Sequence, residues 1–156
     1  MAPVGSRESL AAAFQAGADS VYFGIGTLNM RSKSANEFTI DDLKEIASLC
    51  AERGVKSYLT VNTVIYDEDL PLMRQIVDAA KEAKISAVIA SDAAVMMYCK
   101  QKGVEVHLST QLNISNVEAL KTRMVYRDVH GNCFSSPDEA NRSNERIAER
   151  RAESMI

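Results

Sequence analysis

Short runs of β-branched and aromatic residues alternate with longer, helix-like segments over the first 120 or so residues of the chain. Each short run is almost continuously apolar, and the four runs cover residues 20–24, 55–61, 86–91 and 104–109. Continuous apolarity is typical of strands that are covered on both faces of a parallel sheet. The four runs are therefore predicted to be parallel β-strands.

The segments between these runs carry the start and stop signals of helices. Residues 39–53 open with Thr-x-x-Asp, which resembles a capping box, and Gly54 follows them. Residues 69–83 open with an Asp cap and carry Pro71 in the first turn. The apolar residues that this second segment is expected to bury are Leu72, Ile76, Val77 and Ala80.

Two further helices and the start of a third are predicted from similar signals. The first runs from Ser6 or Glu8 to Ala16 and the second from Asp92 to Lys102, and a glycine follows each of them. Ser115 opens another capping box, with Glu118 at its third helical position. Repeated strand–helix units predict an α/β fold with a parallel sheet. The pattern leaves two architectures open, the doubly wound sheet and the eight-stranded barrel.

The strand–helix pattern stops near residue 121. We expect residues 1–120 to form one partial (β/α) domain with about four to five parallel strands. Residues 121–156 are expected to be an atypical charged tail, helical or disordered, because their pattern is polar nearly all round.

Composition narrows the classes of protein that the chain can represent. It has 156 residues, of which 46% are hydrophobic and 25% charged, the profile of a folded domain. The net charge of −3 gives no overall attraction to nucleic acid or to anionic membranes. No apolar stretch approaches the ~20 residues of a membrane helix, and the start does not read as a secretory signal. We therefore expect a cytoplasmic protein without a membrane partner.

The three cysteines, Cys50, Cys99 and Cys133, are widely spaced, and none forms a C-x-x-C pair. This pattern indicates neither a zinc ribbon nor a thioredoxin-type redox site, and it fits a reducing compartment. Cys50 and Cys99 are predicted to be buried thiols, whereas Cys133 lies in a polar stretch.

Candidate chemistry lies in the loops that follow the predicted strands. The loop at residues 24–38 is long for a βα connection and carries Arg31 and Lys33, which can hold a phosphate or carboxylate or remain solvated. Gly24 and Gly26 form G-x-G without a third glycine, which argues against a dinucleotide site.

Polar residues also follow the second and third runs. Asn62 can bind a ligand through its amide or instead close a turn. Asp92 either caps the next helix or faces the ligand, and we favour capping. The acids at residues 67–69 are better explained by the helix dipole than by a metal.

The segment at residues 107–116 is the densest polar run at a strand end. Gln111 and Asn113 are candidate ligand-binding amides within it, close to Ser109. His107 has no neighbour at metal-ligand spacing, and the sequence identifies no acid that would orient it, which argues against a serine-hydrolase triad. Neutral amides favour recognition of a polar or carboxylate-bearing ligand over proton transfer. We expect no metal site.

Several blocks of the sequence, in order and at consistent spacing, resemble the N-terminal part of peptidase family U32, the collagenase-like proteases. The blocks are AGADSVYFG, NMRS, FTIDDLKEIASLCAERGVKSYLTVNT, AVIASDAAV and VEVHLSTQLNISN. The resemblance covers about residues 1–120, and it implies a TIM-barrel-like catalytic domain and peptidase activity on a peptide substrate.

The resemblance also implies alternatives to proteolysis. Other members of this family serve oxygen-independent hydroxylation of tRNA or rRNA bases or of ubiquinone precursors, and they hold an iron–sulfur cluster through later cysteines. This sequence has no such cluster of cysteines, so we expect no cofactor in this chain. A relative of the RNA-hydroxylation proteins without the iron–sulfur half, and a non-catalytic binding or assembly fragment, are the two alternatives.

Compared with the family pattern, the start looks clipped and the later barrel strands are replaced by the tail. We therefore interpret the chain as a truncated, internally deleted or frameshifted member, or as one that completes its sheet with another chain. Five strands cannot close an eight-stranded barrel, so unpaired sheet edges are expected to favour self-association. The sequence identifies no nucleophile. Any ligand is predicted to bind at the strand ends near Arg31, Asn62, Asp92, Gln111 and Asn113.

Overall fold

The computed structural model describes residues 1–30 and 38–118. The chain divides into two units, Met1–Ser115 and Asn116–Ile156. All the helices and strands described below belong to the first unit. Of the second unit, Asn116–Glu118 are described, and helical backbone begins at Val117, as the capping box at Ser115 predicted. The predicted tail at residues 121–156 lies outside the described residues.

Five parallel strands form one sheet in the first unit. They are β1 (Ala2–Pro3), β2 (Ser20–Gly24), β3 (Lys56–Val61), β4 (Ala87–Ala90) and β5 (Val106–Leu108). The four predicted strands are confirmed. The fifth, β1, has two residues and pairs with Val21 and Tyr22 of β2, and no apolar run announces it.

Four α-helices connect these strands, and two short 3-10 helices lie beside the strand ends. They are α1 (Arg7–Gln15), α2 (Ile40–Glu52), η1 (Asp67–Asp69), α3 (Leu70–Glu82), α4 (Ala93–Lys102) and η2 (Thr110–Leu112). The capping box of α2 is confirmed, because the Thr39 hydroxyl accepts from the Asp42 N–H and the Asp42 carboxylate accepts from the Thr39 N–H.

The predicted side-chain cap of α3 is wrong. Asp69 occupies the N-cap position but makes no side-chain bond to the helix, and its carboxylate instead accepts from the Tyr66 N–H at 3.0 Å. The acidic residues 67–69 therefore form a 3-10 turn that leads into α3. The buried stripe of α3 contains Met73 where Leu72 was expected, because Leu72 remains partly exposed.

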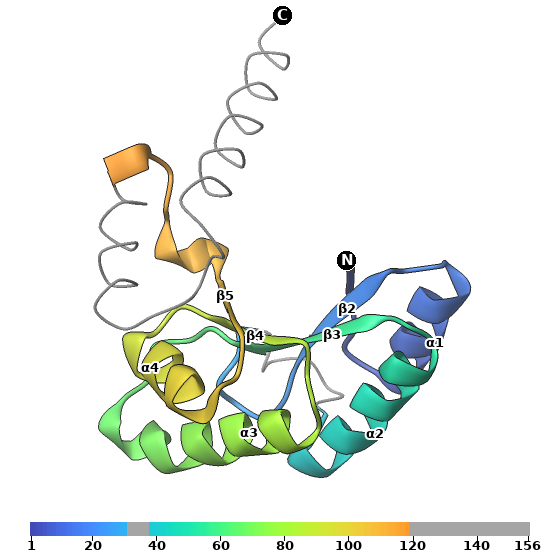
Figure 1. Cartoon of the computed structure of the whole chain (residues 1–156), viewed down its shortest axis with the longest axis horizontal. Coiled ribbons are helices and arrows are strands. Elements are labelled where there is room, and N and C mark those ends of the chain that lie inside the picture. Colours follow the sequence, from blue (N-terminus) through green and yellow to red (C-terminus); the bar gives the residue numbers. More distant parts are fainter. Residues whose placement is uncertain (31–37, 119–156) are drawn as a thin grey trace, which may run out of the picture. The chain divides into compact units, whose positions relative to one another are not determined.

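The strands follow one another across the sheet in the order of the sequence, β1-β2-β3-β4-β5. Figure 1 shows the helices along one side of these strands. A doubly wound sheet reverses its strand order and has helices on both faces, whereas a (β/α) barrel winds in one direction with its helices outside. The architecture is thus the barrel type, with five of its strands present among the described residues.

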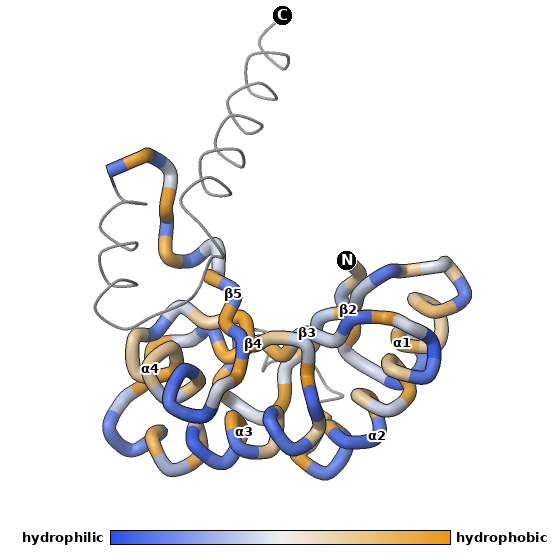
Figure 2. Tube along the Cα trace, in the orientation of Figure 1, coloured by the Kyte–Doolittle hydropathy of each residue, from blue (hydrophilic) through white to orange (hydrophobic). Residues whose placement is uncertain are grey.

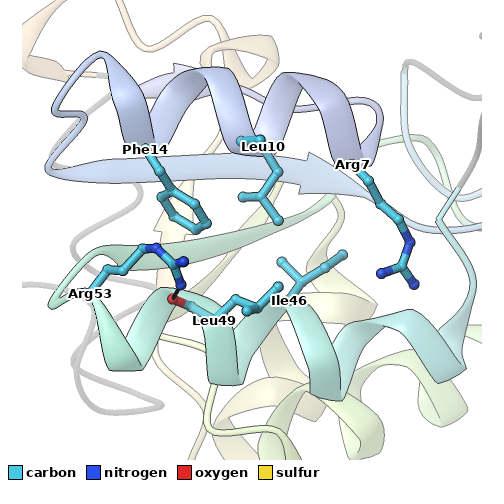
Figure 3. A pocket seen from close by; sticks show the side chains of 7 residues that line it. Arg7, Leu10, Phe14, Ile46, Leu49 and Arg53 are labelled. Atoms are coloured by element: carbon cyan, nitrogen blue, oxygen red, sulfur yellow. Dashed lines mark hydrogen bonds between the residues drawn. The ribbon is translucent and has the colours of Figure 1, made fainter.

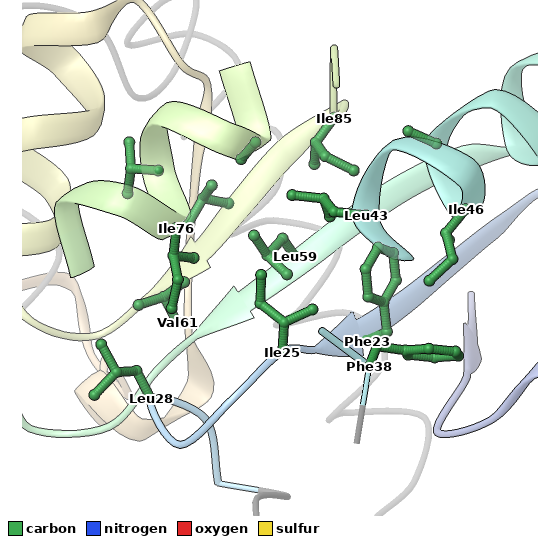
Figure 4. Close-up of a cluster of buried hydrophobic side chains, with 14 of the residues drawn as sticks. Phe23, Ile25, Leu28, Phe38, Leu43, Ile46, Leu59, Val61, Ile76 and Ile85 are labelled. Carbon is green, nitrogen blue, oxygen red and sulfur yellow. The ribbon is translucent and has the colours of Figure 1, made fainter. Parts of the chain in front are cut away.

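The apolar core lies between the helices and the sheet face that they cover. Phe23, Leu59 and Val88 are neighbours in register on this face and are fully buried. They pack with the inner sides of the helices, as Figure 4 shows for Leu43, Ile46 and Ile76. Figure 2 shows hydrophobic and hydrophilic residues alternating along these helices, as expected for helices with one apolar side.

The second face of the sheet carries the alternate strand residues, which lie outside this apolar cluster. They are Tyr22, Tyr58, Thr60, Ala87, Ile89 and His107. In a closed barrel this face lines the interior, and its upper rim is formed by the carboxyl ends of the strands. The polar residues predicted from the sequence follow that rim.

Candidate functional site

Asn62 follows β3 directly and contacts two other strand ends. Its Oδ1 accepts from the backbone N–H of Met30, in the loop after β2, at 3.3 Å. Its Nδ2 donates to Oγ of Ser109, after β5, at 3.5 Å. A turn asparagine would bond to its own loop, so the amide of Asn62 instead joins segments that are far apart in the sequence.

Ser109 is the buried centre of the β5 end, with 6% of its surface exposed. Its hydroxyl donates to Oε1 of Gln111 at 3.2 Å and accepts from the Gln111 N–H at 3.4 Å, which starts the short helix η2. Met30, Asn62, Ser109 and Gln111 therefore form one hydrogen-bonded group, which we call the strand-end site. Ser109 is one of the polar residues of the segment at 107–116, and the sequence did not single it out as a candidate, although its hydroxyl links the two amides.

The middle strand of this group carries small side chains. The register pairs Val61 with Ala90 and Ala90 with Leu108, so the next row contains Asn62, Ser91 and Ser109. The Asn62–Ser109 bond thus passes over β4, where Ser91 leaves room for it. The sequence alone does not place these three residues in one row, because the row depends on the order of the strands in the sheet.

The loop after β2 is held by a buried asparagine that sequence reasoning did not single out. Asn29 is 3% exposed, and its Nδ2 donates to the carbonyl oxygens of Ile25, at 3.3 Å, and Gly26, at 2.8 Å. Its amide lies directly against Gly24, where an added Cβ would overlap it. Asn29 thereby fixes the loop that presents the Met30 N–H to Asn62.

Asp92 caps α4, as favoured from the sequence. Its Oδ1 accepts from the Ala94 N–H at 2.8 Å, and its Oδ2 accepts from the Ile65 N–H at 3.2 Å. The carboxylate therefore also ties the loop after β3 to the end of β4. Because each carboxylate oxygen accepts a hydrogen bond from a backbone N–H, we assign Asp92 a role in positioning the loops at the strand ends.

Asn113, another predicted site residue, has a different place. Asn113 is exposed and adopts the left-handed conformation (φ 50°) that ends η2, a conformation that asparagine tolerates well. The structure therefore gives Asn113 a turn role and does not bring its side chain into the strand-end site. Arg31 and Lys33 lie outside the described residues.

His107 lies one layer below the strand-end site, on the second face of the sheet. Its Nε2 is 3.2 Å from Oε1 of Glu105, and its ring lies 5.0 Å from the Tyr58 ring, with 35° between their planes. The two rings belong to β5 and β3, and they meet diagonally across β4, because the register pairs Tyr58 with Ala87 and His107 with Ile89. Glu105 is the orienting acid that could not be identified from the sequence, although it is two positions away.

The cysteines and the carboxylates do not gather into a ligand set in the part of the chain that the structure describes. Cys50 and Cys99 are free, and both are buried in the apolar core. No three His, Cys, Asp or Glu side chains lie together there in a way that would hold a metal ion. The described residues therefore do not fit an iron–sulfur cluster of the kind that the family resemblance implies.

A surface cavity of about 150 Å³ lies between α1 and α2, on the helix side of the sheet (Figure 3). It is lined by apolar side chains and by Arg7 and Arg53. Arg53 stacks on Phe14 at 4.7 Å and donates to the Leu49 carbonyl oxygen. Because the Arg53 guanidinium is held by these contacts, we find no chemical feature that distinguishes this cavity from an ordinary gap between helices.

Arg7 forms the charged contact between α1 and α2. It binds the carboxylates of Asp42, at 2.8 Å, and Glu45. The bonds from the Thr39 N–H and hydroxyl, and then the charge of Arg7, lower the pKa of Asp42. The bonds from Arg7 lower the pKa of Glu45. These shifts belong to helix packing rather than to the strand-end site.

Within residues 1–30 and 38–118, no helix has the length and apolar content required to cross a membrane. The winding of the sheet and the polar rim at its strand ends define a protein of the (β/α)-barrel class. The model of peptidase family U32 matches residues 5–126. The chain belongs to this family.

Individual relatives agree with the family and differ in their named activities. A protein named collagenase from Porphyromonas gingivalis is 68% identical over 129 residues, which are 83% of this chain and 31% of the relative. The tRNA hydroxylation protein P1 of Bacillus subtilis is 32% identical over 123 residues, which are 78% of this chain and 29% of the relative. The chain thus spans about a third of the length of these curated relatives.

A solved structure supports the fold. A U32 peptidase superimposes with a TM-score of 0.54 at 15% sequence identity, over 75% of this chain and 50% of that one. At this identity the similarity concerns the arrangement of strands and helices. It agrees with the barrel-type winding seen in the strand order.

Proposed function

We propose that this chain is part of a collagenase-like peptidase and that the strand-end site binds the peptide substrate. The strongest sequence support is the 68% identity to the collagenase from Porphyromonas gingivalis. The Asn62 amide carries the structural argument, because it joins the ends of β3 and β5 and the loop after β2.

The chemistry of this site suits a peptide backbone. Asn62 and Gln111 each combine a carbonyl oxygen with an NH₂ group, and Ser109 adds a hydroxyl that donates and accepts. A peptide group presents the complementary N–H and C=O, so neutral amides can bind it without a charge to desolvate. Gln111 is exposed, which leaves its NH₂ group accessible from solvent.

The proposal is tested with the purified 156-residue chain. Hydrolysis of gelatin is measured first, and binding of a blocked Gly-Pro-Ala repeat peptide is then measured by calorimetry. Asn62→Ala is expected to weaken peptide binding about five- to ten-fold, the effect of one or two lost neutral hydrogen bonds. Gln75→Ala removes an exposed amide from α3, on the helix side, and should leave binding unchanged.

Two results would count against the proposal. A clean, folded preparation that neither hydrolyses gelatin nor binds the peptide would contradict the peptidase assignment. Equal weakening by Asn62→Ala and by Gln75→Ala would place any binding elsewhere on the chain.

A second candidate is a relative of the RNA-hydroxylation proteins, favoured by the 32% identity to the tRNA hydroxylation protein of Bacillus subtilis. Binding of tRNA by this chain, together with iron and sulfide after anaerobic preparation, would support it. We expect no iron or sulfide to copurify, because Cys50 and Cys99 lie in the core.

A third candidate is a non-catalytic binding or assembly unit, and the edges of the sheet favour it. β1 and β5 each pair with one neighbour among the described strands. Size-exclusion chromatography with light scattering distinguishes a defined dimer, which would indicate sheets completed between copies, from soluble aggregate.

A further inference from the structure

His107 is the one imidazole in the described part of the chain, and it lies next to the strand-end site without a role in the function proposed above. It lies on β5 two residues before Ser109, which directly follows the strand, so both side chains lie on the second face of the sheet. The register places it beside Ile89 of β4, which itself pairs with Thr60 of β3. Its side chain is 41% exposed and therefore accessible to a ligand.

The contacts of the ring fix its orientation and its neutral tautomer. The Glu105 carboxylate lies 3.2 Å from Nε2 and, when ionised, can only accept a hydrogen bond, so Nε2 carries the proton. Tyr58 packs against the ring from β3 and restricts its rotation. Nδ1 is then an acceptor, and it has no hydrogen-bond partner among residues 1–30 and 38–118.

We propose that His107 is a specificity residue of the strand-end site, whose Nδ1 accepts a hydrogen bond from a backbone N–H of the bound peptide. The inference rests on the proposed function and adds to it. Asn62 and Gln111 bind peptide groups at the rim, and His107 binds the donor that reaches one layer deeper. A bare ring nitrogen is a stronger acceptor than an amide oxygen, so this contact selects peptides with an unsubstituted N–H at that position.

This arrangement makes peptide binding depend on pH. An imidazolium ion has two N–H donors and no acceptor, so protonation of His107 removes the contact. The groups that face the ring are the Tyr58 phenol from β3, the apolar Ile89 from β4 and Glu105, which directly precedes β5. The neutral imidazole is therefore expected to bind the peptide more tightly than the imidazolium ion.

Three variants of the full chain separate this role from a structural one. His107→Phe keeps an aromatic ring against Tyr58 but removes both nitrogens, and it should weaken binding of the blocked Gly-Pro-Ala repeat about five- to ten-fold at pH 8. His107→Asn keeps an acceptor near the position of Nδ1 and should bind the peptide without the pH dependence. His130→Gln changes the second of the two histidines and is the control.

Binding is followed by calorimetry and by NMR of the imidazole C–H signals, which the chain's two histidines make easy to assign. The peptide is expected to shift the His107 signal and leave the His130 signal in place. Unchanged affinity of His107→Phe, or a retained pH dependence in His107→Asn, overturns the role of His107 while the proposed function stands. If the wild-type chain binds no peptide, the proposed function fails and this inference fails with it.

Discussion

Replacing Gly24 with alanine tests the packing of the loop that supports the strand-end site. An added Cβ at this position would overlap the whole amide of Asn29, meeting its Nδ2 at 2.6 Å and its Cγ and Oδ1 still closer. Asn29 is almost fully buried, and its Nδ2 holds two backbone carbonyls. The side chain therefore cannot move aside without leaving polar groups unpaired.

The expected cost follows from two alternatives with similar energies. Overpacking that the loop absorbs by shifting costs about 1–3 kcal/mol. Displacing Asn29 leaves at least one buried polar group unsatisfied, at about 1–3 kcal/mol. Alanine also lowers the conformational entropy of the unfolded chain, which stabilises the folded state by about 0.5 kcal/mol. Gly24→Ala should therefore lower the free energy of unfolding by about 2 kcal/mol.

The measurement is urea unfolding followed by circular dichroism, with Gly5→Ala as the matched control. An added Cβ at Gly5 meets nothing within 4 Å, so that variant should unfold close to the wild type. A double-mutant cycle with Asn29→Ala adds a sharper criterion. Once the Asn29 amide is removed, Gly24→Ala should cost less than it does in the wild-type background.

Two outcomes would refute this reasoning. Equal midpoints for Gly24→Ala and Gly5→Ala would show that the loop accommodates the methyl group without loss. Additive costs in the double-mutant cycle would show that the overlap with Asn29 is not the cause.

Two further predictions concern the helix layer. The pKa values of Asp42 (through Thr39 and Arg7) and Glu45 (through Arg7) are lowered in the folded state, so their stabilising effect is present at neutral pH and is lost as the pH falls through those values. Arg7→Gln should thus lose less stability than the wild type between about pH 5 and about pH 2, in pH-dependent urea unfolding. Burial raises the pKa of the Cys50 thiol. In a Cys133→Ser background, a thiol reagent should therefore react with the folded chain only at the rate at which unfolding exposes Cys50 and Cys99. Immediate reaction would contradict the burial of these two thiols.

Local sequence signals predicted most of the fold. Two strands, Ser20–Gly24 and Lys56–Val61, and the capping box at Thr39 were confirmed. The signal for each of them lies in residues that are close together in the sequence. The two-residue strand at Ala2–Pro3 carries no periodic signal, and only its pairing with β2 defines it. The choice between a barrel and a doubly wound sheet depends on the order of the strands, which periodicity does not contain.

The candidate site was less predictable, because long-range contacts decide its side-chain partners. Asn62 was recognised by its position after β3, but its contacts to Met30 and Ser109 cross 32 and 47 residues. Asp69 looked like a cap because its own sequence neighbours allow one, yet its carboxylate bonds backward to Tyr66.

The side chains of β4 determine whether side chains of β3 and β5 can contact each other. On the second face, β4 presents Ala87 beside Tyr58, Ile89 beside His107 and Ser91 in the row of Asn62 and Ser109, and side chains of β3 and β5 contact each other across these residues. A bulky residue at position 87 would press on the Tyr58 ring, and one at position 91 would separate Asn62 from Ser109, although neither change alters the contacting residues themselves. Under the proposed function, substitutions at these positions would change peptide preference without contacting the peptide.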